Sequence, residues 1–263
     1  MKRVLTKKEV IIDYDEYDKI LNFNNNSEEP PAEYRRIELK DLEPIVKSLD
    51  EYKQGETFEE LVIKKFIPYF GLTENEIINK INFKETKAKN KTNLLSKAIL
   101  GISKKKIEEF EKADIQMKTI KLENSGTLKE SMSFSQIQYK EIVNEDWEDS
   151  YWHNSLTKRF FFVVFQKNEK NELVLKKVMF WTMPPKDLEL AKLFWSDTKQ
   201  KIIDNDFNHF IKISDRSICH VRPKGKNSLD LMETVSGSKE KKKCYWLSSF
   251  YIKNIITDTL RFF

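Results

Sequence analysis

The longest uninterrupted apolar run in the chain, Phe160–Phe165, constrains the fold more than any other feature. This run is far too short to span a membrane, but it suits a strand that is covered on both faces. The stretch Leu173–Trp181 follows after the polar segment Lys167–Asn171, and this arrangement predicts a β-hairpin. The chain must therefore build a packed sheet around the hairpin, and its 18 Phe, 9 Tyr and 5 Trp supply material for the core.

The other predicted elements run in the order helices first, then strands with one crossing helix. Strict alternation over 114–120 predicts a strand that places Gln116 and Lys118 on one face. Apolar spacing and capping signals predict helices at 57–69, from 73, at 94–100, at 187–203 and at 250–260, and further strands at 132–137 and 218–221. This order predicts an α/β (α+β) fold in which a mixed central sheet is flanked by helices.

A polar stretch near the N-terminus divides the chain. The segment 22–31 contains consecutive asparagines, acidic residues and two prolines, and it offers nothing to bury. We therefore expect a flexible or variable N-terminal arm over residues 1–45 and a compact domain over residues 46–263.

The distribution of charge is more informative than its sum. Lys and Arg number 47 and Asp and Glu 42, so the formal net charge of +5 is mild for a nucleic-acid-binding protein. The bases gather in four clusters at 84–91, 104–106, 222–226 and 239–243. Separate basic loops suit a polyanion that touches several of them at once, although solvated lysine loops are the simpler interpretation of charge alone.

Several function classes are excluded by what the sequence lacks. With 6 Gly it has neither a phosphate-binding P-loop nor a dinucleotide-binding glycine motif. Its 2 Cys and 3 His do not have the spacing of a zinc site or a disulfide framework. The N-terminus has no signal-peptide pattern, so we expect a soluble, cytoplasmic protein. Because the glycine, Cys and His motifs of cofactor sites are missing, we expect no cofactor for binding.

Five segments, taken in order, resemble the MutH-type nuclease family, which has the restriction-endonuclease-like PD-(D/E)xK fold. LLSKAILG at 94–101 followed by DIQMKTI at 114–120 resembles the family's helix LLExxLG and its strand D-x6-E-x-K-T. FWTMP at 180–184, VRPKGKNS at 221–228 and FYIK at 250–253 resemble the family's LLWSP, LRPKAANxK and FYLKK elements. The resemblance implies a domain that acts on double-stranded DNA.

Two further segments narrow the resemblance. KESMSFS at 129–135 and NEDWEDS at 144–150 are similar to the regulatory half of type II restriction endonucleases that cut at GATC and carry two MutH-like halves. Together the similar segments cover residues 55–260. The resemblance implies an allosteric effector domain that binds GATC and works with a catalytic MutH-like domain in cis or in trans, with a homodimer as a further arrangement.

The family's catalytic positions fall on an unusual set of residues in this chain. By resemblance, the positions of the pseudo-active site are Lys97, Glu109, Gln116, Lys118 and, in a looser alignment, Lys158. One family acid is thus replaced by a cation, one by a neutral amide, and one is lengthened. Mg²⁺ requires anionic oxygens, so we expect no metal site and impaired cleavage. If the enzyme is active, Glu109 would hold Mg²⁺ with a substitute acid such as Glu108 or Asp114.

The DNA-reading elements of the family are retained. The resemblance implies DNA contacts by Arg222, Lys224, Lys226, Tyr251 and Lys253. Arg and Lys suit the acceptors of guanine or phosphate oxygens, and Pro223 would stiffen the loop that carries them. The tryptophans of the segment 147–152 are expected to pack under a helix rather than to stack on bases.

Three functions remain open from the sequence. The first is GATC binding by a regulatory domain of a type II restriction endonuclease. The second is an active Mg²⁺-dependent endonuclease that cuts at GATC. The third is a DNA-binding adaptor outside restriction. An assay of DNA nicking separates the first two, and a competition assay for GATC separates the third.

Overall fold

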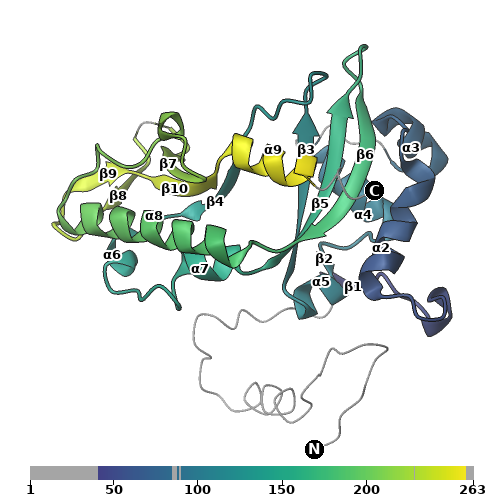
Figure 1. Cartoon of the computed structure of the whole chain (residues 1–263), viewed down its shortest axis with the longest axis horizontal. Coiled ribbons are helices and arrows are strands. Elements are labelled where there is room, and N and C mark those ends of the chain that lie inside the picture. The colour runs from purple at the N-terminus through teal and green to yellow at the C-terminus, as the bar shows by residue number, and fades with distance from the viewer. Residues whose placement is uncertain (1–40, 85–87, 89, 228, 259–263) are drawn as a thin grey trace, which may run out of the picture. The chain divides into compact units, whose positions relative to one another are not determined.

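The computed structural model describes residues 41–258, apart from residues 85–87, 89 and 228. Most of the predicted N-terminal arm, including the polar stretch 22–31, lies outside the described residues. The described residues form two compact units (Figure 1): unit 1 contains residues up to 70 and 78–113, and unit 2 contains residues 71–77 and 114 onward. Helix α3, Glu74–Lys80, is shared between them.

Unit 1 is mainly helical. Its elements are β1 (Leu42–Glu43), η2 (Leu49–Glu51), α2 (Phe58–Phe66), η3 (Ile67–Tyr69), α4 (Lys91–Ile99), β2 (Lys106–Ile107) and α5 (Glu108–Lys112). β1 pairs in parallel with β2, and Ile45 is fully buried, so residues 41–45 belong to this packed unit.

The helices predicted at 57–69 and 94–100 in unit 1 are confirmed, each with a refinement. Thr57 caps α2 through a capping box with Glu60, and Pro68 follows in the 3-10 turn η3, so the predicted helix 57–69 is an α-helix with a tighter last turn. The predicted helix 94–100 begins earlier, at Lys91, and is followed by Gly101 with φ +77°. A left-handed glycine at this point is a common helix terminator.

Unit 2 contains two three-stranded sheets and a short hairpin. The first sheet has the order β3-β5-β6, built from β3 (Ile115–Leu122), β5 (Arg159–Lys167) and β6 (Leu173–Trp181). β3 is parallel to β5 and β5 is antiparallel to β6, so the sheet is mixed as predicted and the hairpin is confirmed. Every residue of the run Phe160–Phe165 is buried.

The second sheet is antiparallel and has the order β4-β10-β7. Its strands are β4 (Met132–Gln136), β10 (Lys243–Leu247) and β7 (Cys219–Pro223), and a hairpin of β8 (Leu231–Glu233) and β9 (Lys239–Lys241) precedes β10. β10 was not predicted, because its lysine-rich approach indicated a solvated loop. β7 extends to Pro223, where we expected a loop. Proline has no backbone N–H to donate to a neighbouring strand, and at the end of a strand this loss is tolerated.

Helices complete unit 2. They are α6 (Tyr139–Ile142), α7 (Tyr151–Leu156), α8 (Pro185–Ile203) and α9 (Ser249–Asp258), with the 3-10 turn η4 (Ile213–Asp215). α9 contacts β6: the Lys177 ammonium of β6 donates to the carbonyl of Ile256, and the rings of Trp181 and Tyr251 lie 6.2 Å apart. Trp152 is fully buried and stacks on Tyr245 of β10 at 4.7 Å, which confirms that the tryptophans of this region pack in the core.

Candidate functional site

A stack of cations and aromatic rings occupies one face of β7 and β10. Trp246 pairs with His220 across the two strands, and their rings lie 6.2 Å apart at an angle of 13°. The guanidinium carbon of Arg222 lies 4.9 Å from the centre of the Trp246 ring, and the ammonium of Lys224 lies 5.9 Å from it. A ring face attracts cations, so Trp246 orders two predicted DNA contacts before any ligand arrives.

Lys224 is also held by β4. Its ammonium nitrogen donates to the carbonyl oxygen of Phe134 at 2.9 Å and to the hydroxyl of Ser133 at 3.1 Å. The carbonyl of Lys224 accepts from the side-chain amide of Gln136 at 2.8 Å. All these partners are neutral, so they fix the position of Lys224 and leave its charge uncompensated.

The loop that follows Lys224 is a tight turn. A Cβ at Gly225 would lie 3.1 Å from the carbonyl oxygen of Asn227 and 3.2 Å from that of Asp230, closer than the backbone readily allows. Asp230 accepts from the backbone N–H of Lys226 at 2.9 Å and pairs with the Lys242 ammonium at 2.6 Å. These bonds, that to Lys242 first, lower the pKa of Asp230. The side chain of Lys226 stays exposed.

The two predicted DNA contacts of α9 differ in exposure. Tyr251 is only 7% exposed, and its hydroxyl donates to the Asp187 carboxylate at 2.7 Å. Burial, followed by this hydrogen bond, raises the pKa of Tyr251. Lys253 is partly exposed. The structure therefore brings Arg222 and Lys224 together on Trp246, whereas the Tyr251 hydroxyl is engaged by the partly exposed Asp187.

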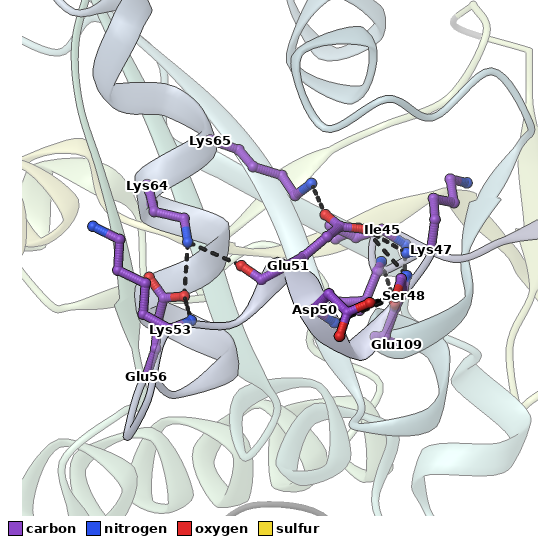
Figure 2. Close-up of polar contacts among 11 residues, drawn as sticks. Ile45, Lys47, Ser48, Asp50, Glu51, Lys53, Glu56, Lys64, Lys65 and Glu109 are labelled. Atoms are coloured by element: carbon purple, nitrogen blue, oxygen red, sulfur yellow. Dashed lines mark hydrogen bonds and ion pairs between the residues drawn. The ribbon is translucent and has the colours of Figure 1, made fainter.

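In unit 1, the residues that the resemblance assigns to acid positions form hydrogen bonds or ion pairs with other groups of the same unit. The two carboxylate oxygens of Glu109 accept the backbone N–H groups of Ile45 and Val46, each at 2.9 Å, as Figure 2 shows for Ile45. Glu108 pairs with Lys112 at 2.7 Å. The Lys97 ammonium donates to the carbonyl of Lys105, and burial lowers its pKa against the opposing effect of Glu111.

In unit 2, Gln116 and Lys118 share one face of β3, as predicted, and this face is turned toward the main core of the unit. In the parallel register with β5 they lie beside Phe160 and Phe162, which belong to the main core of this unit. At the start of the same strand, the ammonium of Lys158 pairs with the carboxylate of Asp114. The carboxylate of Asp114, a candidate substitute acid, is thus paired with a lysine.

Neither unit, taken by itself, presents among its described residues a set of ligands that fits a magnesium ion. Mg²⁺ takes several oxygen ligands, at least some of them anionic, in octahedral geometry. Gln116 carries no charge, Lys97 is a cation, and the carboxylates of Glu109, Glu108 and Asp114 are all engaged. Within the described residues, no group of three or more His, Cys, Asp or Glu side chains is arranged to hold a metal ion.

Replacing Glu109 by alanine tests its observed role. The change removes two hydrogen bonds from backbone N–H groups to a partly buried carboxylate, so we expect the free energy of unfolding to fall by about 1–3 kcal/mol. The matched variant Glu108→Ala loses only an exposed pair within one helix and should cost about 0.5 kcal/mol or less. Urea unfolding of both variants measures the difference, and equal losses would show that Glu109 does not anchor the segment 45–46.

Sequence reasoning missed three contributors to this site. Trp246, Ser133 and Gln136 hold Arg222 and Lys224 in place, but they lie on strands distant in sequence from the R-P-K motif. The one available signal was alternation: Cys244 and Trp246 share a face in the KCYWL run, which was obscured by the lysines before it.

Part of the chain matches a known protein family. A family model described as DNA mismatch repair enzyme MutH matches residues 100–193, which include α5, β3, β5 and β6. This match and the 28% identity to a type II restriction enzyme support a MutH-like restriction endonuclease family for the chain, with the restriction-endonuclease-like fold that the sequence predicted.

The relative is the type II restriction enzyme Sau3AI of Staphylococcus aureus. It is 28% identical over 271 aligned positions, which cover 83% of this chain and 55% of the relative. The chain therefore spans about half the length of this curated relative. None of the described helices is long and apolar enough to cross a membrane.

Proposed function

We propose that the chain binds double-stranded DNA at GATC as the regulatory, allosteric effector domain of a type II restriction endonuclease. Its partner would be a catalytic MutH-like domain, in cis or in trans. The observation that carries the proposal is the contrast between two sets of residues. Arg222 and Lys224 are exposed and ordered on Trp246, whereas the residues at the acid positions are replaced or engaged by the protein.

The chemistry of the exposed set supports reading of DNA. A guanidinium can donate two parallel hydrogen bonds to the O6 and N7 atoms of guanine in the major groove. Stacking on Trp246 reduces the side-chain freedom that Arg222 would lose on binding. Lys226 and the lysines of β9 would contact phosphates, which position the domain without reading sequence.

The regulatory part of the proposal rests on the replacement of two acids by Lys97 and Gln116 and on the contacts that engage the remaining carboxylates. A domain that binds GATC but does not cut it can still bias a catalytic partner, provided that it binds GATC more tightly in the partner's active arrangement. This differential affinity would make the second GATC site an effector of cleavage at the first.

Two assays test the proposal together. In gel-shift competition, we expect duplexes with GATC to displace a labelled GATC duplex at much lower concentration than duplexes with a permuted site. In a plasmid-nicking assay with Mg²⁺ or Mn²⁺, we expect no cleavage above the level of a buffer control. Nicking at GATC would favour an active endonuclease, and binding without preference for GATC would favour an adaptor outside restriction.

A further inference from the structure

Two lysine ammonium groups of unit 2 contact the same residue of β4, one at its ring and the other at its backbone carbonyl. The Lys118 nitrogen of β3 lies 5.3 Å from the centre of the Phe134 ring. The Lys224 nitrogen, which comes from the end of β7, lies 2.9 Å from the carbonyl oxygen of the same Phe134. Strands distant in sequence therefore bring together a residue of the degenerate catalytic motif and a residue of the DNA-reading motif.

This cation pair lacks an acid. In the described part of the chain, neither ammonium forms an ion pair with a carboxylate, although many other lysines do, such as Lys158, Lys167 and Lys242. Burial lowers the pKa of Lys118, and the charge of Lys224 lowers it further. Two neighbouring cations in a partly buried site are unfavourable until an anion approaches them.

The groups around the pair suit an oxyanion rather than a metal. Gln116, on the same face of β3 as Lys118, has a buried side-chain oxygen with no hydrogen-bond partner within the described structure. A half turn of this amide would present its NH₂ group instead. The Ser133 hydroxyl already lies beside Lys224. A carboxylate at position 116 would repel a phosphate, whereas an amide can donate to it.

From this arrangement we infer that Lys118 and Lys224, with Gln116, form a metal-independent site for a phosphate group, and that a phosphodiester of the bound duplex fills it. The inference rests on the proposed function, because DNA must reach this face. It assigns a use to the degenerate motif: the strand that would hold a metal and a phosphate in a nuclease binds the phosphate directly.

The test compares two substitutions on the same strand. Lys118→Met removes the charge and keeps an apolar side chain over Phe134. The control, Lys121→Met, removes one positive charge from an exposed position on the other face of β3. In a buffer with EDTA, we expect Lys118→Met to weaken binding of GATC and permuted duplexes alike, by about tenfold, and to reduce the salt slope by about one. Lys121→Met should bind within about twofold of the parent protein.

Stability gives a second readout that does not depend on DNA. Lys118→Met removes an unpaired, partly buried charge, so its melting temperature should equal or exceed that of the parent. Weaker DNA binding by a variant that has lost stability would count against a direct role for the ammonium. Inorganic phosphate should raise the melting temperature of the parent more than that of Lys118→Met.

A duplex series locates the phosphate and separates the possible failures. A single neutral methylphosphonate is placed at each position along the GATC site in turn. At one position it should weaken duplex binding by the parent protein, and at that position it should not weaken binding by Lys118→Met any further. If Lys118→Met binds duplex like the parent, the inference is wrong even when inorganic phosphate stabilises the parent. If the parent shows no GATC preference but Lys118→Met still loses affinity, the proposed specificity fails and the phosphate site stands. If the parent binds no duplex, both fail.

Discussion

Replacing Arg222 by alanine is expected to weaken binding to GATC duplexes by about 1–3 kcal/mol and to reduce discrimination against permuted sites. Arg222 is exposed, and its guanidinium is held 4.9 Å from the centre of the Trp246 ring. The ordered guanidinium can therefore form the bidentate contact with guanine at little cost in side-chain entropy. Fluorescence anisotropy with GATC and permuted duplexes, at matched salt concentrations, measures the affinity for each duplex and the ratio of the two affinities.

Arg222→Lys is the control for charge. Lysine keeps one positive charge near the DNA but lacks the planar fork of donors, so binding to permuted duplexes and the salt slope should stay close to those of the parent while the preference for GATC falls. Equal losses on GATC and permuted duplexes for Arg222→Ala, with full recovery in Arg222→Lys, would show that Arg222 contacts phosphate and reads no base.

Local patterns predicted most of the elements because the relevant physics is local. The capping box at Thr57, the terminating Gly101 and the alternation around Gln116 each act within a few residues. The hairpin of β5 and β6 was predictable because the short polar segment Lys167–Asn171 joins two apolar runs that are adjacent in sequence. Strand β10 was missed because the lysines before it indicated a solvated loop, and because its pairing with β4 joins segments far apart in the chain.

The candidate site shows the same limit more sharply. Resemblance identified Arg222 and Lys224, but only the structure shows Trp246 beside both. Resemblance also predicted a DNA contact by Tyr251, but it gave no sign that the Tyr251 hydroxyl donates to Asp187. The assignment of Glu109 gave no hint that its carboxylate binds the backbone of residues 45 and 46. Sequence can name the residues of a site, but their partners depend on tertiary packing.

The second large effect concerns His220, which lies on the other strand from Trp246 and is fully buried. Its Nδ1 lies 3.0 Å from the Ser248 hydroxyl oxygen, and that hydroxyl donates to the carbonyl of Ser217 at 2.6 Å. Ser248 must then accept from His220, so the hydrogen of the neutral ring is on Nδ1. Nε2 is buried and has no partner in the described structure. Protonation would put a charge and an unpaired N–H there.

Burial, and then the charge of Arg222, lower the pKa of His220 from 6.5 to about 4. Between these values the unfolded chain binds a proton that the folded chain does not bind, so the contribution of His220 to stability is full above pH 6.5 and falls as the pH decreases toward 4. At about pH 5 the loss should be roughly 2 kcal/mol. Most carboxylates have not yet titrated at that pH.

His220→Gln should remove this pH dependence. We expect the free energy of unfolding of the parent to fall by about 2 kcal/mol between about pH 7 and pH 5, while that of His220→Gln changes much less. His209→Gln, at an exposed position, controls for the loss of one histidine from the unfolded chain. Urea unfolding across this range gives the difference, and NMR titration of the ring reports the pKa directly. A ring that titrates near 6.5 would mean that His220 reaches solvent, and the stack that orders Arg222 on Trp246 would then be open in solution.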